Sequence, residues 1–317
     1  MNLNRRRFLT TSSLALAAAT VDPSKLFAQA ASGAQAGRGA PPVPQTSFNP
    51  LRRSVGYFTG QGGTIGYHVS KDGVVVVDAQ MPATAKVCLE GIKSRDGGRM
   101  IDILVNTHHH GDHTGGNPVF RTSVKTILAH ANVPKLQRDA AARQAAARPD
   151  APAPEIVVAD ATFVNAWEEE VGGERMALKY YGPAHTGGDA VVTFQEADIV
   201  HMGDLVFNRM HPFIDRPAGA SIANWITVIE RTVADHKNDT TYIFGHGSQK
   251  FGVIGARADL LYMRDYLTAL LEFVRGEIKA GKPKDVIVKI ADPLKGFPDH
   301  GPLIERVLTP AYDELAG

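Results

Sequence analysis

The sequence of 317 residues lacks several features that would place a protein in a narrow class. It has one cysteine, Cys88, so no disulfide can form within the chain even in an oxidising compartment. Basic and acidic residues nearly balance, at 34 and 33, and no basic stripe of the kind that binds nucleic acid is present. A run of about 18 apolar residues, which a membrane-spanning helix needs, is also missing. These absences argue against a disulfide-stapled domain, a nucleic-acid partner and a stable membrane anchor.

The N-terminus carries the pattern of an export signal. Residues 5–9 have the twin-arginine form, a small-residue apolar stretch follows over 14–21, and Ala28-Gln29-Ala30 fits an A-x-A cleavage site. We therefore predict a twin-arginine (Tat) signal peptide over residues 1–30, recognition by the twin-arginine export machinery, and a periplasmic mature protein. Cleavage would remove four basic residues and one acidic residue, which leaves a net charge of about −2.

Behind this signal, the chain divides into a linker and one folded domain. Residues 31–50 are rich in Ala, Gly, Pro and Gln and have little that could form a core, which predicts a flexible linker. Residues 51–317 are long enough to bury one large α/β core. Periodicity predicts strands over 64–69 and 73–78, helices over 82–93, 135–147 and 260–280, a hairpin over 168–181 that turns at Gly172-Gly173, and a short helix with Asn117 as its N-cap.

The most informative segment reads HHHGDH and packs four histidines and an aspartate into six positions after the apolar run 101–105. At the end of a buried strand, imidazoles and a carboxylate without partners would cost several kcal/mol of desolvation, and a bound cation removes that cost. Side chains at i and i+2 of an extended segment point the same way, so His108 and His110 can hold one ion. The glycine that follows lets the chain turn and direct Asp112 and His113 to a second ion.

Further ligands are expected downstream, because a site for two ions needs about seven to eight ligands and the segment supplies four. Three residues fit, since each adjoins a predicted buried strand and has glycine nearby, where α/β sheets collect functional groups. The candidate metal ligands are His108, His110, Asp112, His113, His185, Asp204 and His246.

Other histidines lack this spacing. His109 should point away from its neighbours by the alternation of an extended chain, which predicts a supporting or solvent-facing role. His201 lies in a strand pattern and is predicted to be a core or edge histidine with satisfied hydrogen bonds. Three more, His68, His236 and His300, are predicted to lie at the surface.

The order HxHxDH, then His, then Asp, then His resembles the metallo-β-lactamase superfamily over most of the chain behind the signal. The resemblance implies an α/β fold, an αββα sandwich of two similar halves. It places His108, His110 and His185 on a first metal, Asp112, His113 and His246 on a second, and Asp204 between the two as a bridging ligand. Asp78, after 74–77, is similar to a family aspartate that supports the metal site, although a strand-end turn residue fits the sequence equally.

The family's chemistry would use two zinc ions, with iron or manganese as alternatives, that share a hydroxide. Asp112 would be the catalytic residue that orients the hydroxide and handles its proton. The Gly203-Asp204 pair resembles glyoxalase II and lactonase-like members, whereas zinc β-lactamases typically have cysteine or serine at the bridging position. We therefore predict an exported dinuclear zinc hydrolase that cleaves an ester, thioester, lactone or related carbonyl bond of a small-molecule substrate.

Two alternatives remain open. A β-lactamase is favoured by the predicted periplasmic location, and an iron enzyme similar to persulfide dioxygenases would use the same overall motif with one metal. The Ala- and Arg-rich segment 134–154 falls where the superfamily often has a substrate-facing loop, and a surface insertion fits it equally. The sequence does not choose the substrate, because the metal core is shared and the rim loops select what binds.

Overall fold

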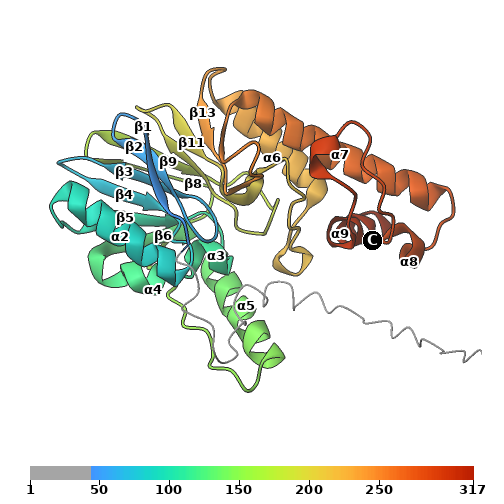
Figure 1. The fold of residues 1–317 in the computed structure, drawn as a ribbon, viewed down its shortest axis with the longest axis horizontal. Helices are drawn as coiled ribbons and strands as arrows, with labels where there is room; N and C mark the ends of the chain where they lie inside the picture. The colour runs from blue at the N-terminus through green and yellow to red at the C-terminus, as the bar shows by residue number, and fades with distance from the viewer. Residues whose placement is uncertain (1–43) are drawn as a thin grey trace, which may run out of the picture. The chain divides into compact units, whose positions relative to one another are not determined.

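Two β-sheets lie face to face at the centre of the structure, a computed structural model that describes residues 44–317 (Figure 1). In the described chain, the first sheet has the order β1 (Ser47–Arg52), β2 (Val55–Thr59), β3 (Ile65–Val69), β4 (Val74–Val77), β5 (Ile101–Asn106), β6 (Val124–His130) and β7 (Ala161–Phe163). The pairs from β1 to β4 are antiparallel, and those from β4 to β7 are parallel.

The second sheet is mostly antiparallel and has a small ladder beside it. Its order is β15 (Ile254–Gly255), β13 (Thr241–Ile243), β11 (Ile199–His201), β10 (Val191–Phe194), β9 (Glu174–Lys179) and β8 (Ala166–Val171). Strands β12 (Phe207–Asn208) and β14 (His246–Gly247) pair separately. The predicted hairpin is confirmed, since β8 and β9 turn at Gly172 and Gly173, both with positive φ.

Helices cover the outer face of each sheet, which completes an αββα sandwich and confirms the predicted fold class (Figure 1). In the part of the chain that the structure describes, the α-helices are α2 (Pro82–Asp96), α3 (Gly111–Thr114), α4 (Asn117–Phe120), α5 (Val133–Ala147), α6 (Ile222–Asp235), α7 (Arg257–Lys279), α8 (Lys284–Ile287) and α9 (Glu305–Ala316). None of the helices in residues 44–317 is long and apolar enough to cross a membrane.

Strand β4 shows why an unbroken apolar run marks a central strand. Val75 and Val77 point into the layer between the two sheets, where they meet Leu178 of β9. Val74 and Val76 point the other way, into the cluster formed with helix α2. Both faces of the strand are therefore buried, and alternation of polar and apolar residues disappears.

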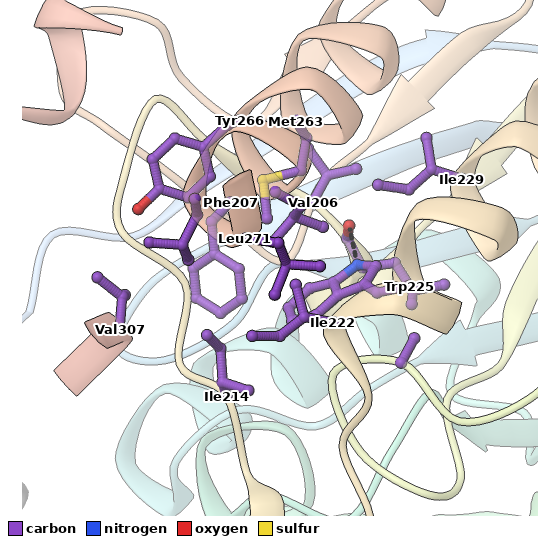
Figure 2. Packing of buried hydrophobic residues seen from close by; sticks show 14 of the residues in the cluster. Val206, Phe207, Ile214, Ile222, Trp225, Ile229, Met263, Tyr266, Leu271 and Val307 are labelled. Carbon is purple, nitrogen blue, oxygen red and sulfur yellow. Dashed lines mark hydrogen bonds between the residues drawn. The ribbon is translucent and has the colours of Figure 1, made fainter. Parts of the chain in front are cut away.

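The second helical layer packs on a cluster built around Trp225 of α6 (Figure 2). The Trp225 indole is fully buried and donates a hydrogen bond to the carbonyl oxygen of Leu205 over 2.9 Å. Tyr266 of α7 and Val307 of α9 belong to the same cluster, so the C-terminal helices pack into the core.

Three predictions about boundaries and burial need correction. Strand β1 begins at Ser47, so the linker predicted over 31–50 is too long at its C-terminal end; the signal peptide 1–30 and residues 31–43 lie outside the described residues. Helix α4 has Gly116 as its N-cap and Asn117 inside the helix, where the Asn117 amide is buried and bonded to Asn106. Residues predicted at the surface are also buried: His68 is 3% exposed and His300 is 8% exposed.

Candidate metal centre

The candidate ligands meet at one edge of the sandwich, because several strands of both sheets end there. His108 and its neighbours follow β5, Asp204 follows β11, and His246 follows β13. The structure brings all the candidates from the sequence into two groups, within which the potential ligand atoms lie within 4.8 Å of one another. The first group is His108, His110, His185 and Asp204, and the second is Asp112, His113 and His246.

In the first group, imidazole nitrogens face one another. The Nδ1 atom of His110 lies 2.9 Å from Nε2 of His108 and 2.9 Å from Nε2 of His185. The opposite nitrogens face acceptors: His110 Nε2 is 2.9 Å from Oδ2 of Asp215, and His185 Nδ1 is 2.8 Å from the carbonyl oxygen of Phe213. A carboxylate and a carbonyl only accept, so these two nitrogens carry the protons.

The protons on the outer nitrogens leave lone pairs on the inner ones. The two inner nitrogens, His110 Nδ1 and His185 Nε2, then face each other over 2.9 Å with lone pairs, beside a fully buried His185 ring, and a cation between them would satisfy both. The residues present therefore fit a metal ion. Three imidazoles, two of them with tautomers fixed by these acceptors, are a common donor set for zinc.

In the second group, histidine nitrogens face carboxylate oxygens. His113 Nδ1 lies 2.8 Å from Oδ2 of Asp78, so this nitrogen carries a proton, and Nε2 of the same ring lies 3.0 Å from Oδ1 of Asp204. These two facing atoms are buried, and neither has a hydrogen-bond partner in the described chain. His246 Nε2 lies 3.1 Å from Oδ2 of Asp112. In the metal-free protein the raised pKa values of His113 and His246 keep a proton on each Nε2 that faces a carboxylate, and a metal ion would take the place of those protons.

Asp204 stands between the two groups. Its Oδ1 faces His113, while its Oδ2 lies 3.5 Å from Nε2 of His185 and 3.4 Å from Nε2 of His246. The backbone beside it leaves no room for a side chain, since a Cβ on Gly245 would lie 2.0 Å from Oδ1 of Asp204. One carboxylate therefore reaches both groups, as a bridging ligand must.

Comparison with known proteins decides the family. The sequence profile described as "Metallo-beta-lactamase superfamily" matches residues 59–270. The chain belongs to this superfamily. Together with the histidine and aspartate cluster, this makes the protein a metallo-β-lactamase-fold hydrolase that depends on metal.

Individual relatives are distant and differ in chemistry. Metallo-beta-lactamase IND-1 of Chryseobacterium indologenes is 24% identical over 188 residues, which cover 59% of this chain and 72% of that protein. The alpha subunit of 2,4-dinitroanisole O-demethylase of Nocardioides sp. is 28% identical over 141 residues, covering 43% of this chain and 38% of the subunit. The stereoselective inverting sec-alkylsulfatase Pisa1 of Pseudomonas sp. has a TM-score of 0.67 at 15% identity, covering 86% of this chain and 50% of the sulfatase.

The two groups of this metallo-β-lactamase-fold site differ in charge. Burial lowers the pKa of His185 to about 3 and that of His108 well below its usual value, so both are neutral. Burial alone would also lower the pKa of His246, but Asp204 and Asp112 outweigh it and raise the pKa to about 10. For His113, Asp204 and Asp78 likewise outweigh burial and hold the pKa well above its usual value.

Metal loading should therefore release about two protons per chain near pH 7.5, one from His113 and one from His246. Both imidazoles are protonated in the metal-free protein at that pH, and a metal binds only the neutral form. The upward shift of the His246 pKa also affects stability. Protonated His246 stabilises the metal-free fold, fully so below about pH 6.5, and this contribution is lost as the pH rises through about 10. Titration calorimetry in buffers of different ionisation enthalpy measures the protons, and release of none would contradict the assignment.

The sequence left open whether Asp78 supports the metal site or is a turn residue at a strand end. The structure shows that it supports the second group. It is fully buried with φ of 67°. Its carboxylate accepts hydrogen bonds from the amide and the hydroxyl of Thr107, each over 2.8 Å, and faces His113 Nδ1. Asp78 thus fixes the ring of His113 and the start of the ligand segment at once. His201 is a satisfied core histidine as predicted, with Nε2 2.9 Å from the carbonyl oxygen of Thr64.

Asp215 is the residue that the sequence analysis missed. It lies 105 positions from His110, and neither a glycine nor a predicted strand adjoins it directly, so no local pattern marks it. Its carboxylate holds His110 and also lies 3.5 Å from Nε2 of His109. His109 points away from the first group as predicted, but toward Asp215 rather than solvent, since it is buried. Burial lowers the pKa of His109, and Arg143 of α5 is among the charges that lower it further, so α5 lies near this side of the site.

Proposed function

We propose that the protein is an exported dinuclear metallo-hydrolase that cleaves an ester, thioester, lactone or related carbonyl bond of a small molecule. The observation that carries the proposal is Asp204, whose two oxygens face both groups of ligands. Two bound ions, zinc with iron or manganese as alternatives, would supply a water of lowered pKa and a Lewis acid for the carbonyl oxygen. His108, His110 and His185 would hold the first ion, Asp112, His113 and His246 the second, and Asp204 would bridge them.

Asp112 is the group best placed to handle a proton. Its side chain is 31% exposed, against 4% for Asp204, so it reaches the open side of the site. Burial alone would raise the pKa of Asp112, but His113 and His246 outweigh it and keep the carboxylate ionised. An ionised carboxylate at the mouth of the site can orient the attacking water and accept its proton.

The bond that is cleaved is inferred from the bridging residue. Asp204 matches the glyoxalase II and lactonase-like pattern, which favours carbonyl substrates other than β-lactams. The likeness to metallo-beta-lactamase IND-1 favours a β-lactamase as the second candidate. The names of the O-demethylase subunit and the sec-alkylsulfatase indicate an aryl methyl ether and a secondary alkyl sulfate as their substrates. Both bond types therefore belong in a substrate screen.

A substrate panel on the zinc-loaded protein tests this function. We expect one ester, thioester or lactone to exceed every β-lactam in kcat/KM by about 100-fold, a margin typical of differences in transition-state binding. A dinitrophenyl methyl ether and a secondary alkyl sulfate serve as comparison substrates. Preference for a β-lactam would establish the second candidate, and activity on none of the carbonyl substrates would overturn the first.

Export through the twin-arginine pathway is the proposed route to the periplasm. The double substitution Arg5→Lys with Arg6→Lys should leave full-length precursor in the cytoplasm, because the receptor reads the paired guanidinium groups. Arg7→Lys is the matched control, since it changes a neighbouring arginine and leaves the pair intact. Fractionation and immunoblotting measure the outcome, and a normal periplasmic yield of the double variant would remove the assignment.

A further inference from the structure

The loop between β12 and α6 sets the orientation of two candidate ligands. We call residues 209–221 the histidine-facing loop. The carbonyl oxygen of Phe213 faces His185 Nδ1, and the carboxylate of Asp215 faces His110 Nε2. These two contacts decide which nitrogen of each ring faces the metal position, so a shift of the loop would turn both ligands.

The middle of this loop has little regular structure of its own to hold it. Between β12 and α6, the described chain forms only the short 3-10 helix η3 (Arg216–Ala218). The other backbone hydrogen bonds of the loop's middle run within the loop or to the turn that carries His185, such as that from the amide of Gly187 to the carbonyl oxygen of Ala218 over 2.8 Å. Two irregular segments that bond to each other need an outside support to fix their position.

The first outside support comes from the C-terminal segment, at the beginning of the loop. His211 Nε2 donates to the carbonyl oxygen of Pro302 over 2.8 Å, while Nδ1 lies 2.7 Å from the hydroxyl of Tyr266. Arg306 of α9 donates to the carbonyl oxygen of His211 over 3.2 Å. Ile214 and Val307 belong to the same buried cluster, as Figure 2 shows, so apolar packing joins the loop to α9 as well.

The second support is at the end of the loop and depends on one carboxylate. Glu314 of α9 lies 3.1 Å from Nη1 of Arg216 and accepts the amides of Ile222 and Ala223 over 2.7 and 2.8 Å. Its side chain is 12% exposed, so water competes little for these bonds. The contact combines an ion pair with the capping of α6, where a negative charge favours the helix N-terminus.

We propose that the C-terminal segment 302–314 positions the metal-binding histidines through these two supports, with Arg306 and Glu314 as positioning residues. Phe213 and Asp215 lie between the supported points, so both supports together define where their acceptor atoms stand. The proposal rests on the proposed metal centre and concerns a part of the chain outside the family match, which ends at residue 270.

The test compares two neighbouring residues of α9. Glu314→Gln puts an amide NH₂ among donors that now share a carboxylate, whereas Asp313→Asn removes only a half-exposed pair with Lys284. We expect Glu314→Gln to weaken zinc binding by the group of His108, His110 and His185 by about tenfold, because the partners behind His110 and His185 would no longer be held in place. Asp313→Asn should leave it unchanged. Competition with a chromophoric chelator measures affinity, and the visible spectrum of the cobalt-substituted protein reports ligand geometry.

A purely structural role would give a different result. If Glu314 only stabilises the fold, thermal unfolding of the metal-free variant changes while zinc affinity and the cobalt spectrum do not. Arg306→Met removes the hydrogen bond to His211 and so tests the first support by the same measurements. It keeps the inference testable if Glu314→Gln folds poorly. Unchanged affinity and spectrum in both variants would overturn the inference alone, whereas absence of bound zinc in the unmodified protein would overturn the metal centre and this inference with it.

Discussion

Hydrolysis should fall by roughly 100-fold or more when Asp204 is replaced with asparagine, while the fold survives. Asparagine keeps the shape of the side chain but removes the charge that faces both groups of ligands. Burial alone would raise the pKa of Asp204, yet His246 and His113 hold it well below its usual range, so the carboxylate is ionised and its charge is what the substitution removes. The second metal should bind more weakly as a result. Steady-state kinetics and metal content of the same preparation measure the effect.

Asp198→Asn is the matched control, because Asp198 lies at the opposite end of β11 and its side chain contacts Thr240 and Lys237. Asparagine tolerates the positive φ at that position and still accepts from Thr240, so activity should be retained. Asp204→Ser and Asp204→Cys give a sharper comparison: lactam turnover that survives in them would favour the β-lactamase candidate. Two bound metals and undiminished hydrolysis in Asp204→Asn would remove the bridging role.

His185→Ala and His108→Ala should each lower metal occupancy and activity together. A site built from three imidazoles loses much of its affinity with one of them, and the remaining two keep their lone pairs aimed at an emptied position. His236→Ala serves as control, since His236 lies at the end of α6 outside both groups. Native metal stoichiometry in both site variants would show that the first position is misassigned.

The strands and the candidate ligands could be read from sequence because the signal is local. Strand β4 is a run of four valines, and β5 ends one residue before the threonine that precedes His108. Asp204 follows Gly203 and His246 lies between Gly245 and Gly247, and each comes shortly after a buried strand. The polar residue and the strand that positions it are neighbours in the chain, so the pattern survives without any knowledge of tertiary contacts.

The supports behind the ligands could not be read in this way. Asp215 owes its role to the path of an irregular loop, and Phe213 acts through a backbone carbonyl that any residue would provide. The burial of His68 and His300 likewise depends on which elements pack over them, not on their own neighbours in sequence. Sequence patterns identify the groups that hold a metal more readily than the groups that orient them.

We propose that the histidine and aspartate cluster holds two metal ions and that hydrolysis depends on them. Metal content per chain, measured by mass spectrometry on the purified full-length protein and followed alongside hydrolysis during chelation and refilling, tests it most directly. We expect about two zinc ions per chain, with hydrolysis lost as they are removed and regained as they are restored. A single iron with oxygen consumption, or hydrolysis that persists after all metal has been removed, would contradict it.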